Sequence, residues 1–197
     1  MANDRAEDQG PAAARPAAGA GQEPDLGGTT PTGDAHEAAP GLPAFRARRG
    51  EFHISTAPAL LDVPLIHEFL CRRSYWAAGI PLEVVRRSLD NSLCFGLYAG
   101  GQQVGFARVV TDRATFAWLA DVFVLEEYRG RGLSKWLVEV VLGYPELQGL
   151  RRFLLGTRDA HGLYRRYGFA PLADPGRFLE VFRPDIYQAG SASPESE

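Results

Sequence analysis

Residues 122–134 read Val-Phe-Val-Leu-Glu-Glu-Tyr-Arg-Gly-Arg-Gly-Leu-Ser, and this stretch decides which fold the chain adopts. The apolar residues up to Val124 are typical of the end of a buried strand, whereas the apolar spacing that begins at Leu133 predicts a helix. The intervening glycines allow backbone amides to point into one concavity, and the helix N-terminus adds unpaired N–H groups with a partial positive charge. The turn therefore predicts a site for a diphosphate group, with Arg129 and Arg131 supplying full positive charges.

The same turn also has a plainer interpretation, an ordinary glycine-rich connection whose arginines are solvated. It is not a Walker loop, because no Gly-Lys-Ser/Thr sequence closes it, and its glycine spacing differs from the dinucleotide fingerprint. Only the rest of the chain can distinguish the two interpretations.

The 197 residues fall into three compositional parts. Residues 1–44 contain no aromatic residue, valine or isoleucine, and they hold six of the fourteen prolines. Such a stretch cannot bury enough apolar surface to offset the entropy of ordering it, so it is predicted to be disordered. Residues 189–197 (Ala-Gly-Ser-Ala-Ser-Pro-Glu-Ser-Glu) follow the same logic, which leaves residues 45–188 as one domain of ordinary size.

Apolar periodicity and turn signals within this domain predict the element order β-α-α-β-β-β-α-β-α-β-β. In one strand Val104, Phe106, Arg108 and Val110 alternate, which is expected to place the Arg108 charge among inward-facing groups. The expected strands are 52–55, 92–98, 104–110, 115–124, 152–156, 169–172 and 178–182, and the expected helices follow Asp62, start at Pro81, start at Leu133 and span 159–167.

Charge and composition exclude several function classes. Residues 45–188 carry nineteen basic and fifteen acidic side chains, a mild excess that suits a polyanionic cofactor but is too small to indicate nucleic acid. No apolar run reaches the ~20 residues of a membrane span, and no signal-peptide pattern follows Met1, so a cytoplasmic protein is expected. No His, Cys or Asp cluster has metal-ligand spacing, so no metal is expected.

At two places the sequence resembles the GNAT acetyltransferases. This family carries Arg/Gln-x-x-Gly-x-Gly/Ala between a strand and a helix, which matches Arg129-x-x-Gly132-x-Ser134 with serine at the last position. The hydrophobic-aromatic-valine approach of the family matches residues 122–124. The second family signature, Asn-x-x-Ala-x-x-Leu-Tyr-x-x-x-Gly-Phe, is present with threonine in place of asparagine as Thr157-x-x-Ala160-x-x-Leu163-Tyr164-x-x-x-Gly168-Phe169.

The resemblance implies an α/β (α+β) architecture, the GNAT fold, with a mixed central sheet of six to seven strands flanked by four helices. The strands that end at residue 124 and residue 156 are expected to splay apart, so that acetyl-CoA, the co-substrate, can bind between them. Main-chain groups of Phe123 and Val124 would hold the pantetheine arm, and amides of residues 130–134 would hold the pyrophosphate. The implied cofactor-binding residues are Val122, Phe123, Val124, Arg129, Gly130, Arg131, Gly132, Leu133, Ser134, Thr157 and Tyr164.

Direct acetyl transfer needs a neutral amine, a partner for the oxyanion and an acid for the leaving thiolate. By resemblance Tyr164 is this acid, although its position beside Leu163 also allows a purely packing role. Relatives often carry Glu or His where this chain has Trp118 or Ala120, so neither position can supply a base. The neighbouring Asp121 is the catalytic or substrate-binding candidate, and the alternative is a structural carboxylate paired with Arg108 or Arg113.

Acceptor pockets of this fold use the first two helices and their linker. The substrate-binding candidates are therefore Tyr75, Trp76, Arg108 and Asp121, while the two aromatic residues could also be core or lid residues. An inward Arg108 would suit a carboxylate or phosphate on the acceptor.

The resemblance implies transfer of an acetyl group from acetyl-CoA to a primary amine of a small molecule. Two alternatives stay open: a protein lysine or N-terminal acetyltransferase, and a non-catalytic acetyl-CoA-binding sensor. A monomer or homodimer is expected, with a small-molecule amine as partner and neither nucleic acid nor membrane.

Overall fold

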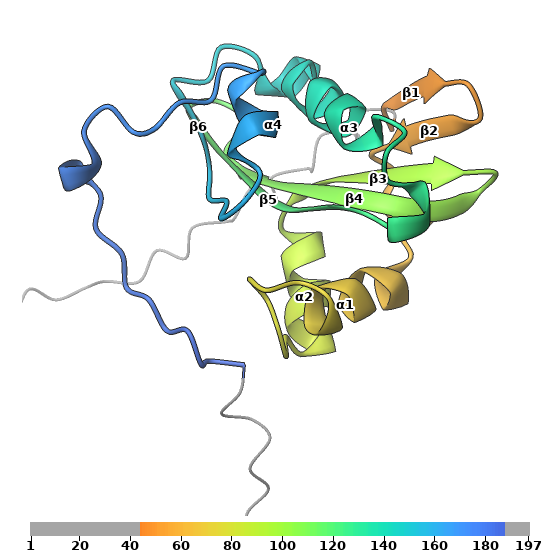
Figure 1. The fold of residues 1–197 in the computed structure, drawn as a ribbon, viewed down its shortest axis with the longest axis horizontal. Helices are drawn as coiled ribbons and strands as arrows, with labels where there is room; N and C mark the ends of the chain where they lie inside the picture. The colour runs from red at the N-terminus through yellow and green to blue at the C-terminus, as the bar shows by residue number, and fades with distance from the viewer. Residues whose placement is uncertain (1–43, 188–197) are drawn as a thin grey trace, which may run out of the picture. The chain divides into compact units, whose positions relative to one another are not determined.

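One mixed sheet organises residues 44–187, the part of the chain that the computed structural model describes (Figure 1). Its six strands follow one another in chain order, β1-β2-β3-β4-β5-β6. All neighbouring pairs are antiparallel except β5 and β6, which run parallel and are connected through a helix. The predicted mixed α/β architecture is confirmed. The strands are β1 Arg46–Arg49, β2 Phe52–Ser55, β3 Leu93–Ala99, β4 Gln102–Thr111, β5 Phe116–Val124 and β6 Arg152–Leu155.

Four α-helices of the described residues cover the two faces of the sheet, α3 and α4 on one face and α1 and α2 on the other (Figure 1). Helix α1 begins after Asp62, whose carboxylate accepts a hydrogen bond from the Leu65 amide at 3.0 Å, as expected of an N-cap. The helices are α1 Val63–Arg72, α2 Leu82–Asp90, α3 Leu133–Leu142 and α4 His161–Arg165.

Two apolar clusters fix these helices to the sheet. The cluster beneath α3 joins Leu137, Val138 and Val141 to Phe95, Leu97, Val109 and Leu119 of the strands. The cluster above α1 and α2 joins Ile66, Phe69, Leu70 and Val85 to Cys94, Phe106 and Phe123. The sheet is therefore apolar on both faces, which is why β3 is buried along almost its whole length.

A β-bulge in β4 changes the expected alternation of that strand. Leu97 pairs with Gly105 and Tyr98 pairs with Gln103, so Val104 is an extra residue opposite β3. Val104 consequently packs in the cluster beneath α3, whereas Phe106 packs in the cluster of α1 and α2. The prediction that Val104 and Phe106 share a face is wrong, because strict alternation does not survive a bulge.

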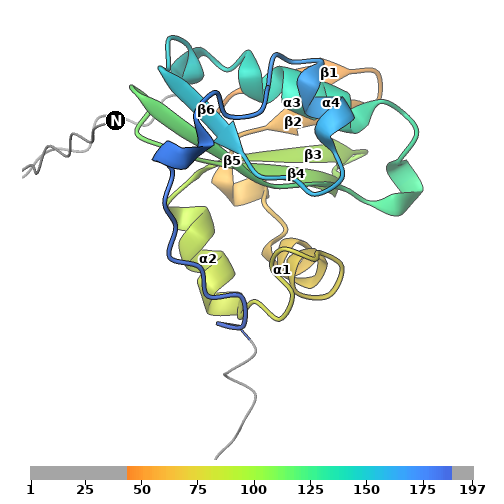
Figure 2. The same ribbon diagram turned by 60° about the vertical axis from the view of Figure 1, so that its left-hand side comes forward.

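The β5–β6 pair separates towards its end, which opens the sheet (Figure 2). The pairing with β6 stops at Leu119 and Leu155, but β5 continues to Val124. On its other side β5 stays paired with β4 through Phe123 and Val124. The backbone between residue 119 and residue 124 therefore has one side without a strand partner.

Two parts of the expected element order are corrected by the structure. The charged edge strand β1 was not predicted, because Arg-Ala-Arg-Arg lacks the apolar alternation that signals a strand. The hairpin expected at 169–172 and 178–182 is wrong, because those residues form no strand. Pro171 and Pro175 cannot donate to a strand ladder, and a single short 3₁₀ turn, Pro175–Arg177, is the only regular element within residues 169–187. The disorder expected within 1–44 and 189–197 falls, apart from residue 44, on residues outside the described range.

Candidate active site

Two cavities meet where β5 and β6 separate. The first, of about 350 Å³, is lined by the end of β5, the glycine-rich turn and the start of α3, and we name it the turn cavity. The second, of about 610 Å³, is lined by the α1–α2 linker, α2, β4 and β5, and we name it the linker cavity. The residues that line both cavities form their shared wall: Tyr75, Trp76, Val122, Asp159, Ala160 and Tyr164.

The glycine-rich turn leaves the N-terminus of α3 uncapped. Gly130 and Gly132 adopt φ values of 77° and 74°, a left-handed conformation that glycine reaches without steric cost. Gly132 is the N-cap of α3, and no side chain caps the helix there. The first amides of α3 therefore remain available at the turn cavity, whose lining includes Gly130, Gly132, Leu133 and Ser134.

The two arginines of the turn do not occupy equivalent positions. Arg129 lines the turn cavity, and its Nε donates to the Val124 carbonyl at 3.1 Å. Arg131 lies outside the lining, with its guanidinium over the Tyr128 ring at 5.4 Å. A further cation, Arg73 of the helix α1 C-cap, lines the cavity and was not expected from the sequence.

Successive residues of β5 direct their main-chain N–H and C=O groups alternately towards β4 and towards the opposite side. The Leu125 amide donates to the Val104 carbonyl of β4 at 2.9 Å, and the Phe123 carbonyl faces Gly105 of the same strand. By alternation, the main-chain groups of Val122 and Val124 face the side that β6 leaves open. Phe123 was expected to act through its main chain, and its carbonyl faces β4, while its ring stacks on Phe69 at 3.8 Å between centroids.

Tyr164 of α4 lies in the shared wall and is 8% exposed. Burial, with smaller contributions from Tyr75 and Asp159, raises the pKa of Tyr164 to about 12. The phenol therefore keeps its proton across the neutral range. Its ring also contacts Phe169 edge-on at 5.9 Å, so the side chain both packs and faces the cavities.

Arg108 and Asp121 form an ion pair inside the linker cavity. Arg108 Nε lies 2.7 Å from Asp121 Oδ2, and its Nη1 donates to Ser92 Oγ at 3.1 Å. The other oxygen of Asp121 accepts a hydrogen bond from the Trp76 indole at 3.1 Å. Arg113, the other partner considered for Asp121, pairs with Glu146 at 2.8 Å.

This ion pair depends on an irregular backbone that sequence patterns do not reveal. Asp121 has a φ of 54°, a left-handed conformation that aspartate tolerates better than most residues. The register between β4 and β5 shifts between Phe106 and Arg108, which brings Arg108 opposite Ala120. Of the alternatives for Asp121, the pairing with Arg108 is the one present, and it neutralises the arginine expected to bind an acceptor anion.

Tyr75 and Trp76 are wall residues and not core residues, because they are 45% and 43% exposed. The Tyr75 hydroxyl accepts a hydrogen bond from the Arg158 amide at 3.0 Å, and the Arg158 guanidinium lies 3.8 Å from the Tyr75 ring centroid. Tyr75 thus connects the α1–α2 linker to the loop that follows β6.

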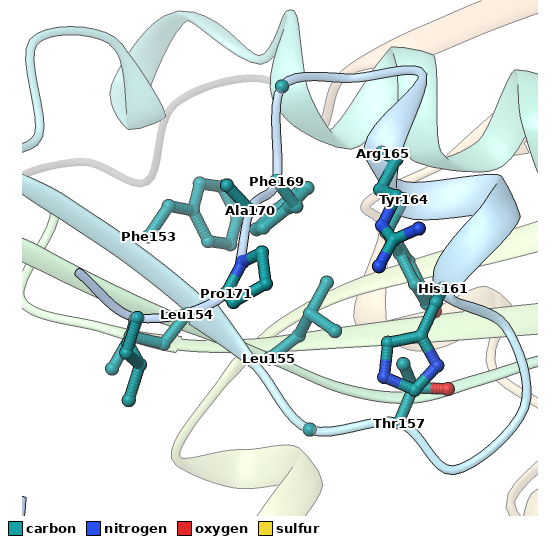
Figure 3. A pocket seen from close by; sticks show the side chains of 13 residues that line it. Phe153, Leu154, Leu155, Thr157, His161, Tyr164, Arg165, Phe169, Ala170 and Pro171 are labelled. Atoms are coloured by element: carbon teal, nitrogen blue, oxygen red, sulfur yellow. The ribbon is translucent and has the colours of Figure 1, made fainter. Parts of the chain in front are cut away.

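Thr157, one of the residues expected to bind the cofactor, makes a local hydrogen bond. Its hydroxyl accepts a hydrogen bond from the Ala160 amide at 3.0 Å, which stabilises the turn before α4. It lines the linker cavity and a third cavity of about 400 Å³ beside β6, but not the turn cavity. Figure 3 shows this third cavity, with Phe153, Phe169 and Pro171 gathered at one part and Thr157 with His161 at another.

Three residues of the linker cavity escaped the sequence interpretation. Arg158 and Asp159 occupy variable positions of the second signature, so only their neighbours carried a signal. Tyr187 comes from the segment after residue 177, which runs towards α1 and α2 (Figure 2), and nothing in the sequence linked it to the site.

A comparison with known proteins agrees with the two sequence signatures at 129–134 and 157–169. The model of the acetyltransferase (GNAT) family matches residues 63–169. The chain belongs to the GNAT acetyltransferase family. Its members are acetyltransferases, and the chain is accordingly an acetyltransferase enzyme.

Individual GNAT relatives support this membership. A protein of Gibberella zeae with a provisional acetyltransferase assignment is 34% identical over 139 residues, which span 59% of this chain and 77% of the relative. A crystal structure of a provisional GNAT acetyltransferase from Xanthomonas campestris pv. campestris is 55% identical, with a TM-score of 0.68 over 69% of this chain and 96% of that chain. A provisional acetyltransferase from Deinococcus radiodurans R1 shares the fold at 21% identity, with a TM-score of 0.52 over 77% of this chain and 100% of its own.

Two further observations concern the described residues alone. No three His, Cys, Asp or Glu side chains within 44–187 lie close enough together to hold a metal ion. No helix in the same range has the length and apolar character needed to cross a lipid bilayer.

Proposed function

We propose that this GNAT acetyltransferase moves an acetyl group from acetyl-CoA to a primary amine of a small molecule, by direct attack of the amine. The observation that carries the proposal is the shared wall. One cavity beside an anion-binding turn and a second beside the α1–α2 linker meet at Tyr164, a buried phenol that keeps its proton.

The residues around the turn cavity fit acetyl-CoA. Gly130 and Gly132 combine positive φ with open space where a side chain would project, so the turn can approach a pyrophosphate closely. Amides of Leu133 and Ser134 would bind the phosphate oxygens, and Arg129 and Arg73 provide positive charge at the same cavity. The outward main-chain groups of Val122 and Val124 would bind the pantetheine arm, although the Val124 carbonyl already accepts from Arg129.

Acetyl-CoA supplies the thioester that reacts with the amine. The chain's own contribution at the wall is made by Tyr164, which holds a proton on its Oη for the leaving sulfur. The exposed rims of Tyr75 and Trp76 would cover the reacting groups and limit the access of water. Arg108 and Asp121 hold the two strands and the Trp76 indole in place, and we assign them positioning roles.

The proposal is tested by thiol release from acetyl-CoA against a library of polyamines, amino acids and aminoglycosides, with a lysine-containing peptide alongside. We expect release that depends on a small amine. Release with the peptide alone would favour a protein acetyltransferase, and binding of acetyl-CoA without release for any amine would favour a sensor.

A further inference from the structure

The linker cavity contains two carboxylates, and they are in different electrostatic situations. Asp121 and Asp159 are the acidic residues of its lining, and Asp159 is also the acidic residue of the turn cavity. Asp159 is therefore the carboxylate of the shared wall, at the place where the two cavities meet.

Asp121 is nearly buried and its charge is already paired. Its Oδ2 is paired with Arg108 at 2.7 Å, its Oδ1 accepts from Trp76 at 3.1 Å, and its side chain is 9% exposed. The carboxylate of Asp159, in contrast, makes no hydrogen bond or ion pair with any side chain or amide of residues 44–187. Its negative charge is felt at the wall, because it is one of the groups that raise the pKa of Tyr164.

The nearby cations do not compensate Asp159. The neighbouring Arg158 places its guanidinium 3.8 Å from the Tyr75 ring centroid. Arg108 is neutralised by Asp121 within the same cavity. The Tyr75 ring already carries the Arg158 guanidinium, and the lining holds further aromatic rings, a type of group that attracts cations: Trp76, Trp118, Tyr164 and Tyr187.

We propose that Asp159 binds the ammonium group of the acceptor at the shared wall, and that the acceptor is a cationic amine with an apolar or aromatic body. This inference rests on the proposed acetyl transfer, which it deepens by naming the acceptor class and its binding residue. The body of the acceptor lies against the aromatic lining of the linker cavity, and its nitrogen lies beside Tyr164. Before the attack the bound ammonium gives one proton to the solvent that reaches the exposed Asp159, so that the neutral amine reacts with the thioester. Because Asp159 is exposed, solvent screens this contact, and about a threefold contribution to affinity is expected.

The test uses binding and does not depend on turnover. The full chain is titrated calorimetrically with 2-phenylethylamine and with 2-phenylethanol, which has the same body without the charge. We expect the native chain to prefer the amine, and Asp159→Asn to bind it about threefold more weakly with unchanged alcohol binding. Glu180→Gln, which removes an exposed carboxylate outside all three cavities, is the matched control and should bind like the native chain.

The outcomes separate this inference from the proposed function. An unchanged amine preference in Asp159→Asn, or no amine preference in the native chain, overturns the role of Asp159. Thiol release from acetyl-CoA is then measured with the same amine for the native chain and for Asp159→Asn. Turnover with an unchanged KM in the variant contradicts Asp159 alone, whereas an Asp159-dependent amine preference without any thiol release contradicts acetyl transfer alone.

Discussion

Arg108 of β4 and Asp121 of β5 form a nearly buried ion pair at 2.7 Å, with side-chain exposures of 17% and 9%. Both residues line the linker cavity, and Asp121 holds the Trp76 indole. Two charges so far removed from water depend on each other, because each would be costly without its partner.

The substitution Asp121→Asn should destabilise the fold by about 3 kcal/mol, because it leaves the Arg108 charge without a counterion. Urea unfolding followed by tryptophan fluorescence measures the change. Glu68→Gln removes half of the exposed Arg73–Glu68 pair and should cost less than about 1 kcal/mol. Equal losses in the two variants would show that the Arg108–Asp121 pair is not structural.

Tyr98→Phe should stabilise the fold by about 1 kcal/mol, because the Tyr98 hydroxyl is buried without a hydrogen-bond partner among the described residues. Tyr167→Phe is the control: it removes the hydroxyl that donates to the Lys135 carbonyl at 2.8 Å and should lower stability by about 1 kcal/mol. Thermal unfolding at neutral pH compares the two variants with the native chain, and a destabilised Tyr98→Phe would contradict the account.

Tyr98 also gives stability a dependence on pH. Burial raises the pKa of Tyr98 from its ordinary value of 10.0 to about 12. Below pH 10 the folded and unfolded states both keep the proton; between pH 10 and 12 only the unfolded state loses it. Stability should therefore fall as pH rises through this window, and the fall should be smaller in Tyr98→Phe, as urea unfolding at a series of alkaline pH values would show.

Leu179→Asp should leave the free energy of unfolding within about 0.5 kcal/mol of the native value, because Leu179 is 97% exposed. In the hairpin that the sequence favoured, the same change would place a charge in a strand that packs on the sheet. A large loss of stability in urea unfolding would therefore support the hairpin and contradict the exposed position of Leu179.

Gly132→Val should abolish acetyl-CoA binding, since valine is strained at a φ of 74° and its side chain would project into the turn cavity. Gly149→Val is the matched control, with a φ of 76°, open space around the new side chain and no place in any cavity lining. Calorimetric titration with acetyl-CoA distinguishes them. An unchanged affinity of the Gly132→Val variant for acetyl-CoA would show that the cofactor does not bind at the turn.

The sequence alone predicts the features whose signals lie within one contiguous segment. The glycine turn at 130–132 was predicted because its glycines, strand and helix are contiguous, and the structure places it at the turn cavity. Tyr164 was reached through a signature of fixed spacing on one short segment, and it lies in the shared wall. In such cases the spacing of residues along the sequence directly predicts which residues lie close together in the structure.

Other features depend on irregularities of the backbone that leave no signal in the sequence pattern. The register shift between Phe106 and Arg108 and the positive φ of Asp121 decide which side chains meet Arg108, and neither leaves a signal in the apolar alternation of the strands. Asp159 lies in the wall because β6 ends at Leu155 and the loop after it turns towards Tyr75. The expected final hairpin was wrong: Pro171 interrupts its first half, and residues 178–182 form no strand despite their apolar alternation.

The most direct measurement of the central claim is the rate at which acetylated amine forms from acetyl-CoA, followed by product mass in the native chain and in Tyr164→Phe. We predict amine-dependent product in the native chain and a rate lower by about 10²–10⁴-fold in Tyr164→Phe, with acetyl-CoA affinity retained. The same rate in both proteins, or acetyl-CoA binding without product in the native chain, would contradict acetyl transfer at the shared wall.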